Sequence, residues 1–171
     1  MKRLLLFRHA KSSWTEAGLD DHERGLARRG RRAAPAMGQI MKVRGLQPGR
    51  VLCSTSARTR QTLSLAAAAW SDPVETVYLD SLYHARARSL LDAVRVHGGM
   101  VQTLMVVGHQ PGLQDFALEL ADRGEPGLLG QMGEKFPTAA LAVIEFPARS
   151  WSELAPASGR LSHYLRPRDL D

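Results

Sequence analysis

Short apolar runs, each followed by a helical pattern, constrain this chain most strongly. Leu4-Leu5-Leu6-Phe7 and Thr103-Leu104-Met105-Val106-Val107 lack the polar alternation of a half-exposed strand. Strands of this kind are covered on both faces. Two further short runs, 50–53 and 75–78, are also expected to be strands. The four strands alternate with helical patterns at 26–42, 57–70, 87–97 and 112–120. This order predicts an α/β protein, a three-layer α/β/α sandwich with a mostly parallel central sheet.

The remaining segments are less regular. Residues 10–25 are polar and predict a functional loop, and 125–137, rich in Gly and Pro, predicts a loop over one face. Residues 139–146 and 151–154 are expected to form late strands, and 160–171 either a final strand or a tail. Pro35 lies inside the first helical pattern, which predicts either a kink or a helix that starts later.

Composition limits the class of protein. A length of 171 residues predicts one domain, residues 1–171. No apolar run is long enough to span a membrane, and the N-terminal apolar stretch is too short for a signal peptide. The single cysteine, Cys53, excludes an internal disulfide and favours a buried structural thiol in a reducing, cytoplasmic protein.

The net charge of +6 indicates an anionic partner. Nucleic acid is disfavoured because no nucleic-acid-binding motif is legible. The densest basic run, 28–32 (Arg-Arg-Gly-Arg-Arg), is either a solvated helix face or a docking patch for an acidic or phosphorylated protein. The sequence gives no oligomeric state.

Polar residues follow three of the expected strands. Arg8-His9 follows the first strand, Ser54 to Arg58 the second, and Gly108-His109 the strand at 103–107. Sites in parallel sheets lie beyond the carboxyl ends of the strands. Two arginines and two histidines would therefore converge there, and they suit a phosphate dianion, because arginine binds its oxygens and histidine can attack phosphorus.

Each of these residues also has a structural alternative. Arg8-His9 alone is weak evidence, His109 could cap a turn, and Arg58 could be a surface residue. Other chemistries fit less well: the six histidines lack metal-ligand spacing, and neither a phosphate-binding P-loop nor a Gly-x-Ser-x-Gly turn is present.

At these positions the sequence resembles the histidine phosphatase superfamily, also called phosphoglycerate-mutase-like. The family's Arg-His-Gly reads Arg8-His9-Ala10 here, and residues 54–62 (STSARTRQT) resemble its Ser-x-x-x-Arg-x-x-Gln-Thr signature. Gly108-His109-Gln110-Pro111-Gly112 matches the second-histidine motif. With residues 82–85 (LYHA) and the short length, the chain is most similar to the small SixA-type phosphohistidine phosphatases.

The resemblance implies a mechanism. His9 would attack phosphorus and carry the phosphoryl group, while Arg8, Arg58 and a protonated His109 would bind its oxygens. The resemblance implies neither metal nor cofactor. Further candidates for substrate contact are Ser12, Thr15 and His84.

Most family members supply a carboxylic acid after the third strand, but the matching position here is His84, and Asp80 is out of register. A site without a strong acid suits phosphohistidine, whose imidazole can leave as a neutral group, better than an alcohol phosphate. We therefore expect a phosphatase acting on phosphohistidine in proteins. The alternatives are a small-molecule phosphomonoesterase acting on a phosphorylated metabolite, a non-catalytic phosphoprotein-binding module, and a nucleic-acid binder.

Overall fold

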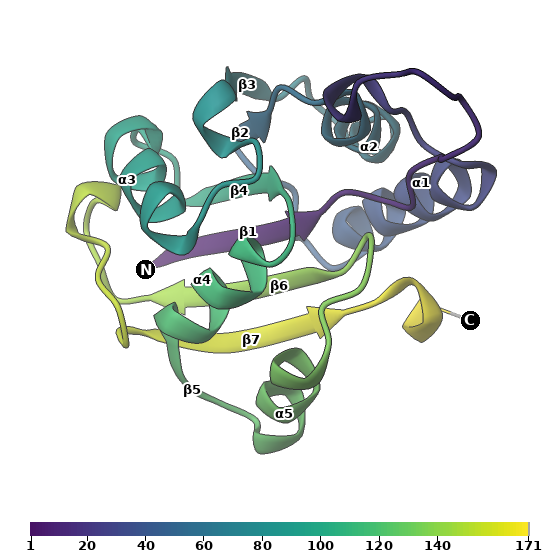
Figure 1. Cartoon of the computed structure of the whole chain (residues 1–171). Helices are drawn as coiled ribbons and strands as arrows, with labels where there is room; N and C mark the ends of the chain where they lie inside the picture. Colours follow the sequence, from purple (N-terminus) through teal and green to yellow (C-terminus); the bar gives the residue numbers. More distant parts are fainter. Residues whose placement is uncertain (171) are drawn as a thin grey trace.

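A seven-stranded sheet with the order β3-β2-β4-β1-β6-β7-β5 organises the protein (Figure 1). The computed structural model describes residues 1–170. The strands are β1 (Lys2–Arg8), β2 (Arg50–Ser54), β3 (Glu75–Leu79), β4 (Thr103–Gly108), β5 (Ala121–Gly124), β6 (Leu141–Phe146) and β7 (Gly159–Leu165). Four neighbouring pairs are parallel, and β6 is antiparallel to both β1 and β7. The predicted α/β fold with a mostly parallel sheet is confirmed.

Helices cover both faces of this sheet. They are α1 (Arg28–Val43), α2 (Ala57–Ala67), α3 (Ala87–His97), α4 (Gly112–Leu120) and α5 (Pro126–Glu134), with 3₁₀ turns η1 (Asp21–Glu23), η2 (Asp80–Leu82), η3 (Trp151–Glu153) and η4 (Pro167–Leu170). In Figure 1, α3 and α4 cross the near face of the sheet and α1 lies behind it.

Alternate residues of the central strands enter two separate hydrophobic cores. Leu4 and Leu6 pack in the core beneath α3, α4 and α5, and Leu5 and Phe7 pack in the core beneath α1 and α2. Both sets are fully buried. The unalternated apolar runs in the sequence follow directly from this burial on both faces.

Three expectations about individual elements are wrong. Residues 125–137 contain α5, which begins at Pro126, where a missing N–H costs nothing, and buries Met132 in the core. Residues 151–154 form no strand: Trp151–Glu153 is the 3₁₀ turn η3, and the buried Trp151 indole N–H anchors it by donating to the Val101 carbonyl at 2.8 Å. The helix expected to reach Trp70 ends at Ala67.

Helix α1 begins at Arg28 and continues through Pro35, so a later start is also wrong. Gly30 lies in its first turns against the segment that follows β1. A Cβ there would lie 2.2 Å from the Lys11 carbonyl oxygen, so only glycine allows this approach. The contact fixes the loop after β1 beside α1. Residues 159–165 form β7, which resolves the expectation of a final strand or a tail.

None of the helices in residues 1–170 combines the length and the apolar character that crossing a membrane requires.

Candidate functional site

The carboxyl ends of β1, β2 and β4 meet at one edge of the sheet. Arg8 pairs in register with Gly108, and Cys53 with Val107, so the residues that follow these strands are neighbours. They line a cavity of about 250 Å³. Its lining comprises Arg8, His9, Lys11, Ser12, Trp14, Asp21, Arg24, Arg58, His84, His109, Gln110 and Thr138. The four residues predicted to converge, Arg8, His9, Arg58 and His109, all lie here.

His9 is held in one tautomer. Its Nδ1 lies 2.8 Å from the carbonyl oxygen of Ala10, and a carbonyl can only accept, so Nδ1 carries the proton. Burial, helped by the charges of Arg8, Arg58 and Arg24 and opposed by the bond to Ala10, lowers the pKa of His9 to about 4. At neutral pH the imidazole is therefore uncharged, with its lone pair on Nε2, and can act as a nucleophile.

Two arginines flank this histidine. Arg8 donates from Nη1 to the Phe136 carbonyl at 2.9 Å, and Arg58 donates from Nη1 to the Asp21 carbonyl at 2.8 Å. The Nε atom of each is buried without a hydrogen-bond partner. Within residues 1–170, the buried side-chain atoms without a partner belong to Arg8, Arg50, Arg58 and His109. Three of these four residues line the cavity, where an anion would satisfy them.

His109 faces His9, with the two ring centroids 5.4 Å apart. Its Nε2 lies 2.8 Å from Ser54 Oγ, and Nδ1 is the atom without a partner. Burial, together with the neighbouring His9 and Arg58, lowers the pKa of His109 to about 2. In the free protein His109 is therefore neutral, since burial among cations disfavours the protonated ring. The expectation of a protonated His109 concerns the phosphoryl-bound site and stays a prediction.

The sequence reasoning missed Asp21. Its carboxylate accepts hydrogen bonds from the Tyr83 hydroxyl, from Arg58 Nη2 at 3.0 Å and from Arg24 Nε at 3.1 Å. The bond from Tyr83 and those from the two arginines hold the pKa of Asp21 well below its usual range. Asp21 belongs to the loop singled out as functional, but nothing in the sequence shows which acidic residue of that loop folds back onto Arg58.

Of the other residues considered as site candidates, some line the cavity and some do not. Ser12 lines the cavity and accepts from Arg24 Nη1 at 2.9 Å. His84 also lines it, and its Nε2 accepts from Arg58 Nη2 at 3.0 Å. Thr15 is exposed, bonds to Ser13 and lines a different cavity. Asp80 accepts from Thr55 Oγ1 at 2.7 Å and is not part of the lining. The structure thus places Ser12 and His84, but not Thr15 or Asp80, beside His9.

His84 also has an unusual backbone. Its φ is +51°, the left-handed region that residues other than glycine rarely adopt. Its ring stacks on Tyr83 at a centroid distance of 4.2 Å and meets His109 edge-on at 5.2 Å. Backbone strain of this kind persists only where the surrounding contacts enforce it.

Two motif residues hold the site together without reaching the cavity. Thr62 Oγ1 accepts from the Ala10 N–H at 2.9 Å and donates to the Arg58 carbonyl at 2.7 Å, which ties the His9 loop to helix α2. Gln61 Oε1 accepts from the Leu26 N–H at 2.8 Å. The Gln-Thr pair of the motif therefore positions the loop that follows β1.

In the described part of the chain, no group of three or more His, Cys, Asp or Glu side chains is arranged to hold a metal ion.

Comparison with known proteins identifies this arrangement. Residues 4–82 match the model of the histidine phosphatase superfamily, branch 1. An uncharacterized protein of Mycobacterium tuberculosis is 35% identical over 163 residues, which cover 94% of this chain and 99% of that protein.

Two solved structures have the same fold over nearly the whole chain. One, from Nakamurella multipartita, is named as a candidate phosphohistidine phosphatase SixA and is 31% identical, with a TM-score of 0.82 over 97% of this chain and 96% of that one. The other, from Agrobacterium tumefaciens, bears the same name and is 30% identical, with a TM-score of 0.81 over 97% and 98%. With the family motifs gathered around one cavity, this chain belongs to branch 1 of the histidine phosphatase superfamily.

Proposed function

We propose that the protein is a phosphatase that removes the phosphoryl group from phosphohistidine in proteins and carries it transiently on His9. The observation that carries the proposal is the tautomer of His9. Its Nδ1–H is committed to the Ala10 carbonyl, so Nε2 keeps the lone pair, in a cavity that is also lined by Arg8 and Arg58, whose buried Nε donors have no partner.

In the first step His9 Nε2 forms a bond to phosphorus as the bond between phosphorus and the substrate nitrogen breaks. The electron pair goes to the substrate imidazole, which leaves neutral because its other ring nitrogen carries a proton. Arg8 and Arg58 stabilise the oxygens of the transferring group. The Ala10 carbonyl, which accepts from Nδ1–H, stabilises the positive charge that the phosphorylated His9 ring acquires.

In the second step water attacks phosphorus and the bond to His9 Nε2 breaks. The electron pair returns to Nε2, one proton of the water passes to solvent, and inorganic phosphate leaves. A bound phosphoryl dianion also raises the pKa of His109 from its low value in the free protein, because opposite charge favours the protonated ring. His109 can then donate to a phosphoryl oxygen.

The state of Asp21 supports a nitrogen-bound phosphoryl group as substrate. Asp21 is the carboxylic acid side chain in the cavity lining, and its hydrogen bonds keep it ionised. An alkoxide leaving group requires a proton that this carboxylate does not hold, whereas a protonated phosphohistidine brings its own.

The test compares two substrates. The protein is incubated with a histidine-phosphorylated protein or with a sugar phosphate, and mass spectrometry follows the phosphorylated peptides before and after. We expect loss of phosphohistidine with wild type and none with His9→Ala. Rapid hydrolysis of the sugar phosphate with phosphohistidine untouched would instead indicate a small-molecule phosphomonoesterase, and turnover of neither would indicate a binding module.

A further inference from the structure

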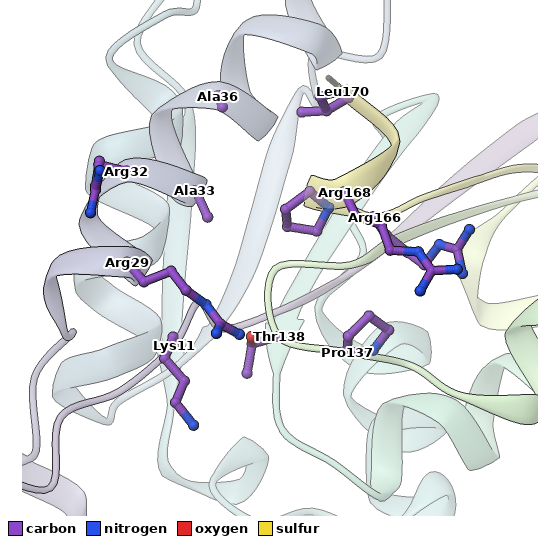
Figure 2. A pocket seen from close by; sticks show the side chains of 11 residues that line it. Lys11, Arg29, Arg32, Ala33, Ala36, Pro137, Thr138, Arg166, Arg168 and Leu170 are labelled. Carbon is purple, nitrogen blue, oxygen red and sulfur yellow. The ribbon is translucent and has the colours of Figure 1, made fainter.

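A second and larger cavity opens beside the phosphoryl site. Its volume is about 700 Å³, and Lys11 and Thr138 line both cavities. It lies between α1, the segment before β6 and the C-terminal η4 (Figure 2). A ligand whose phosphoryl group sits at His9 can therefore extend past Lys11 into this space.

The cavity is strongly basic. Arg29 and Arg32 reach it from α1, Arg166 and Arg168 from the end of the chain, and Lys11 from the loop after β1. Figure 2 shows the Arg29 side chain extending from α1 toward Thr138, with Lys11 close by. Among the described residues, the lining contains no Asp or Glu side chain.

Most of this charge is not neutralised within the fold. Asp169 pairs with Arg166, with Nη2 and Oδ1 2.9 Å apart. Among residues 1–170, no carboxylate lies within 4.0 Å of the charged nitrogens of Lys11, Arg29, Arg32 or Arg168. Crowded like charges disfavour the compact state, and an anionic ligand would relieve their repulsion.

Helix geometry separates the basic run 28–32 into two pairs. Arg29 and Arg32 lie with Ala33 and Ala36 at the spacing i, i+3, i+4, i+7, which places all four on one face of α1. Arg28 and Arg31 line a different cavity. Because alanine side chains are small, this face of α1 presents two positive charges beside a small apolar surface.

We propose that this cavity binds carboxylate side chains of the phosphorylated protein, next to its phosphohistidine. The inference rests on the proposed function and adds the chemical class of the substrate's flanking residues, Glu or Asp. This cavity is much larger than the phosphoryl cavity, so it has room for a polypeptide segment. The alanines, the prolines and Leu170 of its lining can contact aliphatic parts of that segment. The lining contains no aromatic side chain on which a nucleic-acid base could stack.

The test uses two phosphohistidine peptides of equal length, one with glutamates flanking the phosphohistidine and one with glutamines at the same positions. Wild type is compared with the double variant Arg29→Gln/Arg32→Gln. A matched control, Arg44→Gln/Arg160→Gln, removes two charges from exposed arginines that line neither cavity.

We expect wild type to have a KM for the glutamate peptide about tenfold lower than for the glutamine peptide, as two charge-assisted contacts would give. Arg29→Gln/Arg32→Gln should lose most of that preference with kcat unchanged, and the control should keep it. The preference should also shrink as salt is raised. Equal KM values for the two peptides in wild type, or equal losses in both double variants, would overturn the proposal.

A binding measurement separates this inference from the proposed function. The unphosphorylated forms of the two peptides are titrated into wild type and Arg29→Gln/Arg32→Gln by calorimetry or fluorescence anisotropy. Tighter binding of the glutamate peptide, dependent on Arg29 and Arg32, supports the acidic subsite even if no phosphohistidine is hydrolysed. Equal binding of both peptides overturns it even if hydrolysis is rapid.

Discussion

Single hydrogen bonds determine the chemistry of this site. The Ala10 carbonyl fixes the tautomer of His9, and the Ser54 hydroxyl forms a hydrogen bond with Nε2 of His109. Neither contact can be read from the sequence, because both depend on ring orientation. The placement of His9 and His109 at the cavity, by contrast, could be predicted, because each directly follows a strand.

The His9 tautomer is directly measurable. With the pKa of His9 lowered to about 4, the ring should be neutral at pH 7, with the proton on Nδ1. Nitrogen-15 NMR of the imidazole distinguishes the two tautomers from the protonated ring. A proton on Nε2, or a ring that titrates near 6.5, would show that the described hydrogen bond does not control His9.

Asp21 should act as a positioning residue for Arg58. In Asp21→Asn the charged acceptor is lost, and with it a hydrogen bond worth roughly 1.5–3 kcal/mol, so kcat/KM for a phosphohistidine peptide should fall by about tenfold or more. A merely structural role would not move the pH dependence of the rate, whereas removing this negative charge should shift it.

Asp80→Asn is the matched control for this variant. It removes a carboxylate that bonds Thr55 outside the cavity, so its kcat/KM and its pH profile should remain close to wild type. Equal effects of the two substitutions would mean that Asp21 does not act through Arg58.

At the scale of elements, two glycines let helix α1 lie unusually close to neighbouring backbone. Gly30 lets α1 approach Lys11, and Gly38 lets it approach α2, where a Cβ would lie 2.1 Å from the Ala66 carbonyl oxygen. Because Arg58 is part of α2 and Lys11 borders both cavities, these contacts also position the site.

Gly38→Ala should therefore destabilise the protein by about 1–3 kcal/mol, since overpacking forces the two helices apart. Gly130→Ala in α5 is the control: nothing lies within 4 Å of its added Cβ, and alanine favours helix by up to about 1 kcal/mol. Chemical denaturation measures both. Similar changes in the two variants would contradict the close α1–α2 packing.

The elements that the sequence predicted well are those whose burial is complete. Strands β1 and β4 are covered on both faces, so their continuous apolar runs predict buried strands directly. Helix α5 and turn η3 were missed because tertiary packing of Met132 and Trp151, rather than local propensity, determines them. Strand β5 has little apolar pattern of its own and exists by pairing with β7.

For the molecule as a whole, the site lowers the stability of the fold at acid pH. Two buried histidines have pKa values lowered from 6.5, to about 4 for His9 and about 2 for His109. Their burial beside Arg8 and Arg58 disfavours the protonated rings. The arrangement that keeps His9 nucleophilic thus also makes the fold sensitive to acid.

The direction of this effect follows from proton binding. Between about pH 6.5 and 4 the unfolded chain binds more protons at these histidines than the folded one, so the free energy of unfolding falls as pH falls. We expect a loss of roughly 2 kcal/mol or more between pH 7 and pH 4.5, at about 1.4 kcal/mol per pKa unit.

Urea denaturation across this pH range measures the slope, and His109→Gln serves as the comparison. The variant should have a shallower dependence, because it removes one of the two depressed groups. A slope that His109→Gln leaves unchanged would contradict the low pKa of His109.

The central claim, that His9 carries the phosphoryl group, is tested most directly by trapping it. Wild type is mixed rapidly with a phosphohistidine peptide, quenched in base, where phosphohistidine survives, digested and examined by mass spectrometry. We predict a phosphoryl adduct on His9 that appears before inorganic phosphate and is absent from His9→Ala. Release of phosphate with no adduct on His9, or unchanged turnover in His9→Ala, would contradict the claim.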